Sequence, residues 1–122
     1  MRKQAKLTAV FDALKSLLLP YASQFIVAAD TEHSYQLVTP YIMPRDERLP
    51  FATVSIKGDF VCYNFMPLAT HKQIATELPP LLAGVRQGKT CLCFKQLDES
   101  AIEELKKLTK RGFDCYKNSG YI

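Results

Sequence analysis

The sequence predicts an α+β domain in which an antiparallel sheet is packed by helices from the two ends of the chain. Two observations predict it: amphipathic segments open and close the chain, and extended segments joined by short turns lie between them. The 122 residues are 48% hydrophobic, with seven Phe and six Tyr, which suits one domain with one core over residues 1–122. We therefore expect two layers, with an antiparallel sheet of about five strands packed by the N- and C-terminal helices.

The first predicted element is a helix from Lys3 to Leu19. Its apolar residues recur at spacings of three and four and form one stripe, which consists of Leu7, Val10, Phe11, Leu14, Leu17 and Leu18. Pro20 ends the helix, because the residue before a proline is pushed out of helical geometry.

Two strands and a long loop are predicted next. The segments Gln24 to Ala29 and Ser34 to Thr39 are rich in β-forming residues and flank a short polar turn. The stretch from Pro40 to Pro50 holds three prolines and four charged residues. That composition predicts a loop, and we expect it to be the most mobile part of the chain.

A hairpin follows the loop. Residues Thr53 to Lys57 alternate polar and apolar side chains, and Gly58 and Asp59 then lead into the segment from Phe60 to Met66. Glycine at the first position suits a two-residue type II′ turn. The second strand is apolar on both faces, which predicts a central place in the sheet.

The C-terminal half is predicted to end the sheet and add helices. Pro67 to Leu78 forms a short helix with Ile74 inward, Pro79 to Gly88 is a mobile linker, and Lys89 to Lys95 is the last strand.

The final helix begins after Asp98, which caps it, and Ile102, Leu105 and Leu108 face inward. Basic residues crowd its expected last turn, where they match the helix dipole: Lys106, Lys107, Lys110 and Arg111. Gly112 is expected to close the helix as a C-cap.

Charge and location are only loosely constrained. The net charge of +4 permits an anionic partner without requiring one, and the basic residues are spread along the chain. The basic start of the chain resembles a signal peptide for a few residues, but Asp12 and Lys15 interrupt the apolar run that follows. We expect a cytoplasmic protein without a membrane span, in which the four cysteines stay reduced.

Two strips of sequence carry a family resemblance. The first strip runs from Gly58 to Pro67 (Gly-Asp-Phe-Val-Cys-Tyr-Asn-Phe-Met-Pro), and the second runs from Gly88 to Lys95 (Gly-Lys-Thr-Cys-Leu-Cys-Phe-Lys). Together with Asp98 and the segment from Leu105 to Phe113, these strips resemble the YdhG-like domains of unknown function. The match covers the C-terminal half. The sequence departs from the family at Asn64, where members often carry His, and at Cys93, where they carry a polar residue other than cysteine.

The resemblance implies a two-layer α+β fold and no established enzymatic activity. Some relatives have been likened to frataxin and proposed as iron chaperones, which makes iron the cofactor that the resemblance suggests. Asp98, Glu99, Glu103 and Glu104 are the densest carboxylate group of this chain and are therefore the candidate iron ligands. The alternative is that they cap the helix and pair with lysines one turn away, as Glu103 would with Lys107.

Cys91 and Cys93 occupy positions i and i+2 of a predicted strand, so their thiols point to the same face. Two adjacent thiolates could bind zinc or form a redox pair. The spacing is shorter than that of structural zinc sites, and Cys62, Cys115, His33 and His71 add no second ligand pair. Buried, inert cysteines are the favoured interpretation.

Lys89 belongs to a Gly88-Lys89-Thr90 fragment that resembles part of a phosphate loop. The upstream glycine is missing, because Ala83 stands there, and the fragment leads into a strand instead of a helix. A nucleotide site is therefore disfavoured, and Lys89 remains a candidate anchor for an anion.

A small pocket is the other candidate site. Tyr63 and Asn64 mix aromatic and polar groups on a predicted central strand, beside a loop that carries Tyr41 and Met43. Asn64 would orient the ligand there. The alternative is that the aromatic residues pack the core and Asn64 bonds to the backbone.

The sequence therefore favours a non-enzymatic binding or interaction module over an enzyme, because no catalytic constellation is visible in it. An iron chaperone is the second hypothesis. RNA contact through the basic segment from Lys106 to Arg111 is the third, and we regard a nucleic-acid partner as the least favoured. A small ligand, a protein partner and a homodimer all remain open.

Overall fold

Six antiparallel strands form one sheet in the order β1-β2-β3-β4-β6-β5. The computed structural model describes residues 2–44 and 46–122, and the side chains of residues 2–6 lie outside this description. The strands are β1 (Ile26–Asp30), β2 (Ser34–Ile42), β3 (Arg48–Lys57), β4 (Phe60–Phe65), β5 (Arg86–Gln87) and β6 (Cys91–Phe94). The helices are α1 (Arg2–Leu18), a 3-10 helix η1 (Leu19–Gln24), α2 (Pro67–Thr70), α3 (Lys72–Thr76), α4 (Pro80–Ala83) and α5 (Glu99–Asn118).

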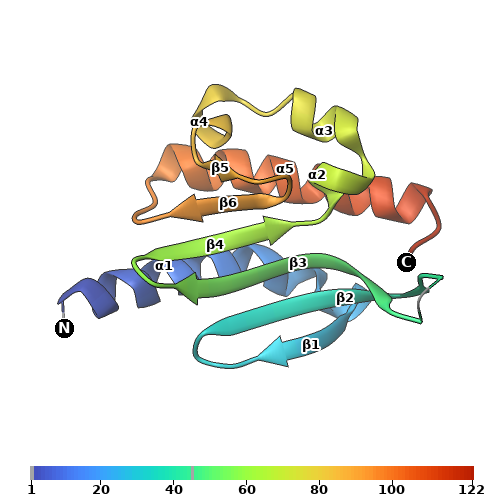
Figure 1. Ribbon diagram of the computed structural model, residues 1–122, viewed down its shortest axis with the longest axis horizontal. Helices are drawn as coiled ribbons and strands as arrows, with labels where there is room; N and C mark the ends of the chain where they lie inside the picture. The colour runs from blue at the N-terminus through green and yellow to red at the C-terminus, as the bar shows by residue number, and fades with distance from the viewer. Residues whose placement is uncertain (1, 45) are drawn as a thin grey trace.

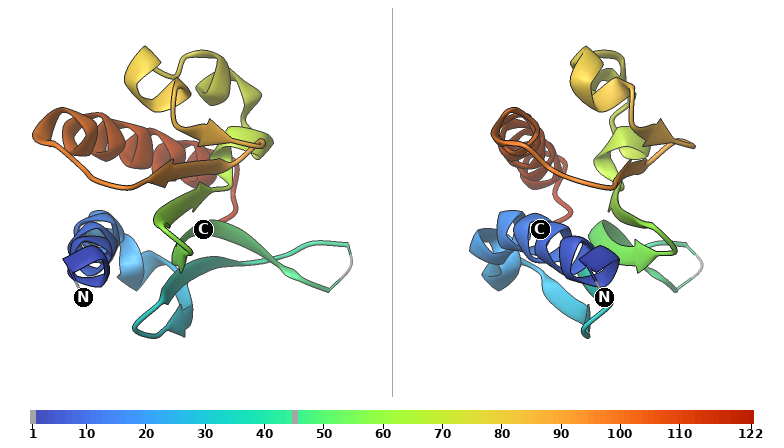
Figure 2. Two further views of the ribbon diagram at one scale, coloured as in Figure 1. Left: turned by 60° about the vertical axis from the view of Figure 1, so that its left-hand side comes forward. Right: turned by 90° about the vertical axis from the view of Figure 1, so that its left-hand side faces the viewer.

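The predicted α+β architecture is confirmed. The two long helices α1 and α5 lie on one side of the sheet, and the short helices α2, α3 and α4 gather near its β5 edge (Figures 1 and 2). The sheet has one strand more than expected. The added strand is β5, which pairs with β6 in a segment that we expected to be a linker, and α4 lies in the same segment.

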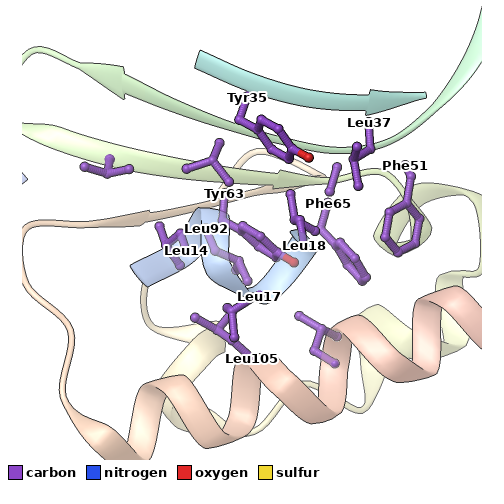
Figure 3. Close-up of a cluster of buried hydrophobic side chains, with 14 of the residues drawn as sticks. Leu14, Leu17, Leu18, Tyr35, Leu37, Phe51, Tyr63, Phe65, Leu92 and Leu105 are labelled. Carbon is purple, nitrogen blue, oxygen red and sulfur yellow. The ribbon is translucent and has the colours of Figure 1, made fainter. Parts of the chain in front are cut away.

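The core lies between the sheet and the two long helices. Because side chains of a strand alternate between its faces, Tyr63 and Phe65 of β4 both point to the helix side, where they are fully buried. Leu14 and Leu18 of α1 and Leu105 of α5 meet them there (Figure 3). The apolar stripes of both terminal helices therefore pack against the sheet, as the spacing of their apolar residues predicts.

The opposite face of the sheet carries mainly polar side chains, with Lys57 at the end of β3, and no helix in the described chain covers it (Figures 1 and 2). One cross-strand row on this face follows the register of the ladder and consists of Gln36, Thr53, Asn64, Cys91 and Gln87. Cys62 and Cys93 form the neighbouring pair on the same face.

The loop predicted from Pro40 to Pro50 is shorter in the structure. β2 runs on to Ile42 and β3 starts at Arg48, so residues 43, 44, 46 and 47 are the described residues between the two strands, and Asp46 has a φ of 61°. Arg45, which belongs to the predicted loop, lies outside the described residues. Two of the prolines are tolerated because their strands are irregular at these positions, where the β2–β3 register shifts.

The predicted hairpin is confirmed. β3 pairs with β4, the pair nearest the turn is Lys57 with Phe60, and Gly58 in the turn has a φ of 58°. The predicted helix from Pro67 to Leu78 is split into α2 and α3 at His71, which has a non-helical backbone (φ −127°, ψ 77°).

The C-terminal helix is longer than predicted. Asp98 caps α5 as expected, because its Oδ1 accepts a hydrogen bond of 2.8 Å from the backbone N–H of Ala101. Gly112 is not a C-cap, however: α5 continues to Asn118, and Gly112 is buried in its middle. The apolar pattern continues through Phe113 and Tyr116, and this tertiary packing overrides the local signal of a glycine.

Among the described residues, no helix is both long and apolar enough to cross a bilayer.

Candidate functional site

The four residues predicted to bind a ligand do not converge. Tyr63 points into the core, and Asn64, its neighbour on β4, points to the opposite face of the sheet. Tyr41 is 42% exposed at the end of β2, where its ring lies 4.9 Å from that of Tyr121. Lys89 lies in the β5–β6 turn. The structure therefore does not form the predicted pocket around Asn64.

Tyr63 is tied to α5 by its hydroxyl group. The Oη atom of Tyr63 lies 2.6 Å from Oγ1 of Thr109, and both side chains are buried. Burial raises the pKa of Tyr63 above its ordinary value, because the phenolate would be desolvated. This phenol is a structural group that stays protonated, and it is not placed to contact a ligand.

Removal of this hydroxyl is expected to destabilise the fold. In Tyr63→Phe the buried hydroxyl of Thr109 loses its partner, which costs about 1–2 kcal/mol in the free energy of unfolding. Urea denaturation measures the change. Tyr41→Phe is the matched control, since the ring of Tyr41 is exposed, and equal stabilities of the two variants would contradict the role given to the bond.

Asn64 lies between Thr53 and Cys91 in the polar row of the open face. Its Oδ1 is buried and has no hydrogen-bond partner among the described residues. The expectation that Asn64 bonds to the backbone is therefore not met by this atom.

Lys89 lines a different cavity, which we call the basic pocket. Its residues come from α2, from α3 and from the β5–β6 hairpin, and they are Leu68, Ala69, Lys72, Ala75, Thr76, Arg86 and Lys89. The cavity has a volume of about 370 Å³. This lies within the range of small-ligand sites, which is about 300–1,000 Å³.

Arg86 is the most unusual group of the basic pocket. It lies opposite Leu92, so its side chain is on the helix side of the sheet. Its Nη2 donates a hydrogen bond of 2.8 Å to the backbone oxygen of Lys89, which fixes the guanidinium group against the turn. Its Nε is buried and has no partner among the described residues.

The positive charges of the basic pocket are uncompensated. Within the described chain, none of the three cations of the pocket forms an ion pair. Glu77, the acidic residue that follows Thr76, pairs with Arg111 instead. This contact holds the pKa of Glu77 below its ordinary value. The lining itself contains no carboxylate.

The predicted iron ligands lie along the first turns of α5. One carboxylate oxygen of Asp98 accepts the hydrogen bond of the helix cap. Oε1 of Glu103 lies 3.5 Å from Nζ of Lys106, and Oε1 of Glu104 lies 3.6 Å from Nζ of Lys107. Glu103 thus pairs with Lys106 and not with Lys107. Glu99, Glu103 and Glu104 border an open depression beside α4. No group of three potential metal ligands is assembled in the described part of the chain, and iron binding stays a prediction.

The cysteines are arranged differently from the expectation. Cys62 and Cys93 are direct partners on β4 and β6 and form a disulfide, whereas Cys91 and Cys115 are free. The expectation of four reduced cysteines is wrong for this pair. The bonded pair also differs from Cys91 with Cys93, the redox pair that the sequence offered as the less favoured alternative. The physical reason is the ladder, which places Cys62 opposite Cys93 although 31 positions separate them.

The basic segment considered for RNA contact carries paired charges. Lys106 and Lys107 face Glu103 and Glu104, Lys110 lies 3.2 Å from Asp114, and Arg111 pairs with Glu77. Because these are exposed pairs, each is weak. They nevertheless lower the local positive potential that phosphate contacts need.

One contact between possible catalytic groups was not predicted. Nε2 of His71 lies 3.0 Å from Oγ of Ser119, and Nδ1 lies 2.9 Å from Oγ1 of Thr70. The two residues are 48 positions apart, so no sequence spacing could indicate the pair. A hydroxyl group replaces the carboxylate that orients the base in a triad. The backbone N–H groups of Ser119 and Gly120 are bonded to helix carbonyls and cannot serve as an oxyanion hole. This contact ties α5 to the α2–α3 junction.

Comparisons of the chain with protein-family models, with curated proteins and with solved structures find no match. The resemblance to YdhG-like domains therefore stays an expectation, and function has to be inferred from the residues themselves.

Proposed function

We propose that this chain is a non-enzymatic binding module, and that its ligand is a small organic anion held in the basic pocket. The observation that carries the proposal is the buried, unpartnered Nε of Arg86 in a cavity lined by two further cations. A buried donor without a partner costs about 1–3 kcal/mol, and more when its group is charged. An anionic oxygen at this position would recover that free energy.

The apolar part of the lining argues for an organic ligand over a bare ion. Leu68 is buried beneath the pocket, and Ala69 and Ala75 have side chains too small to fill the space above it. The hydroxyl of Thr76 donates to the backbone oxygen of Gln73, which leaves its methyl group for contact. A ligand with an anionic head and an apolar body would satisfy both parts of the lining.

The chemistry of the lining supports binding without turnover. The pocket offers two ammonium groups, one guanidinium group and one hydroxyl already used in a hydrogen bond. It contains no imidazole, carboxylate or thiol to move a proton or to act as a nucleophile. Its groups are suited to holding and orienting an anion.

Loss of the guanidinium group tests the proposal. Arg86→Gln is expected to weaken binding of the probe benzoate or phenyl phosphate about tenfold or more, because a charge-assisted hydrogen bond contributes about 1.5–3 kcal/mol. Calorimetry with each probe measures the affinity. Amide chemical shifts recorded during the titration show whether residues Lys72, Arg86 and Lys89 respond.

Two further variants distinguish binding in the basic pocket from general attraction by the net positive charge of the protein. Lys57→Gln removes one positive charge at the exposed end of β3, outside the pocket, and should leave the affinity unchanged. Ala75→Phe keeps every charge but fills the cavity, and should abolish binding. If neither probe binds the parent protein, or if Arg86→Gln and Lys57→Gln weaken binding equally, the proposed function is wrong.

A further inference from the structure

On the basis of the proposed function, we infer that the anionic head of the ligand is a phosphate monoester in its dianionic form. The basic pocket collects Lys72, Arg86 and Lys89 around one small cavity, and its lining contains no acid. The ligand therefore has to supply enough negative charge and enough acceptor oxygens for three cations.

A carboxylate would leave most of this charge uncompensated. It carries one negative charge and two oxygens, so it would neutralise one of the three cations. A phosphate monoester carries a charge of about −1.5 to −2 near pH 7 and presents three acceptor oxygens. It can therefore bond to the guanidinium group and to both ammonium groups at once.

Arg86 is already positioned for a tetrahedral oxyanion. Its bond from Nη2 to the Lys89 backbone holds the planar guanidinium group in place, so a ligand does not have to order it. The same bond ties Arg86 to the turn that carries Lys89, which is a second cation of the lining. Lys72 belongs to the same lining and comes from α3, a separate element.

The size and lining of the pocket indicate a small ester and not a polynucleotide. A volume of about 370 Å³ is near the lower end of the small-ligand range. The lining has no aromatic side chain on which a base could stack. Four basic residues of α5 that could have extended the positive surface are paired with acids: Lys106, Lys107, Lys110 and Arg111.

The charge of the ligand, and not that of the pocket, should set the pH dependence. The charged groups that line the cavity are Lys72, Arg86 and Lys89, and the lining contains neither a histidine nor a carboxylate. His71 precedes Lys72, but both of its ring nitrogens are bonded to hydroxyls outside the lining, and Glu77 is held by Arg111. The dianion of a phosphate monoester takes up one proton near pH 6 and becomes a monoanion, so its affinity should fall below that pH.

The test compares phenyl phosphate with phenyl sulfate, which has the same shape but a single negative charge. By calorimetry at about pH 7.5, the parent protein should bind phenyl phosphate about tenfold more tightly than phenyl sulfate. At about pH 5, where phenyl phosphate is a monoanion, the two affinities should become similar. In Arg86→Gln both probes should bind weakly. Inorganic phosphate, tested alongside, measures what the apolar body contributes.

The outcomes distinguish the two proposals. If phenyl sulfate binds as tightly as phenyl phosphate at the higher pH, the dianion inference is overturned while the anion-binding function stands. The dianion inference is also overturned if the preference for phenyl phosphate does not change with pH. If no probe binds and no amide of the pocket responds, both proposals fall together.

Discussion

Reduction of the Cys62–Cys93 disulfide is expected to lower the free energy of unfolding by about 3.7 kcal/mol. The two cysteines are 31 positions apart, so the bond closes a long loop in the unfolded chain. The chain-entropy estimate for a loop of this length gives this value at 25 °C. The folded state should lose little, because the backbone ladder between β4 and β6 aligns these residues without the bond.

Urea denaturation with and without a dithiol reductant measures this effect. The parent protein should unfold at a lower urea concentration when reduced, and Cys62→Ala should be insensitive to the reductant. Cys115→Ala is the control, because Cys115 is free and its variant should keep the full response. Alkylation of four thiols in the unreduced protein, or a reductant that leaves the parent curve unchanged, would show that the pair is not bonded.

The elements with strong local signals were predicted well. The stripe of α1, the Gly58-Asp59 turn and the Asp98 cap each depend on residues that are close together in the sequence, and the structure contains all three. Neighbouring residues decide such features, so one sequence is enough to indicate them.

β5 had no comparable signal. It has only two residues, Arg86 and Gln87, which is too short for any periodicity. β5 pairs with the edge of β6 that would otherwise be unpaired. The backbone N–H of Cys93 also donates a hydrogen bond to the backbone oxygen of Val85, just before β5. A strand that depends on its neighbour in this way requires knowledge of the sheet order.

The residues of the candidate site likewise come together only through the tertiary fold. Lys89 was found because it lies in a recognisable fragment, but Lys72 is 17 positions away and becomes its neighbour only through the packing of α3. The grouping of Tyr63 with Asn64 was an error that the sequence could have prevented. Adjacent residues of a strand point to opposite faces, so the two could not line the same pocket.

Gly112→Ala is expected to destabilise the protein by about 2 kcal/mol, although alanine is the better helix former. A Cβ at this position would lie 2.9 Å from Cγ of Pro67 and would overlap the ring of Phe65. Phe65 is fully buried, with the rings of Phe51 and Tyr63 at 5.3 Å and 5.6 Å, so it has no room to move. Overpacking costs about 1–3 kcal/mol, and the overlap with the ring of Phe65 places this site at about 3 kcal/mol, so about 2 kcal/mol remains after the roughly 1 kcal/mol of helix propensity gained.

A double-mutant cycle with Phe65 identifies the cause. Phe65→Leu alone should destabilise the core, because it removes part of a buried ring, but it also opens space against α5. Adding Gly112→Ala to Phe65→Leu should therefore cost much less than adding it to the parent protein, with a coupling of about 1 kcal/mol or more. Lys110→Ala is the control for a substitution of the same helix outside the core; it removes only the weak, exposed pair with Asp114 and should change stability little. Additive effects of the two core substitutions, or a Gly112→Ala variant as stable as the parent, would mean that α5 does not approach β4 as closely as the contact requires.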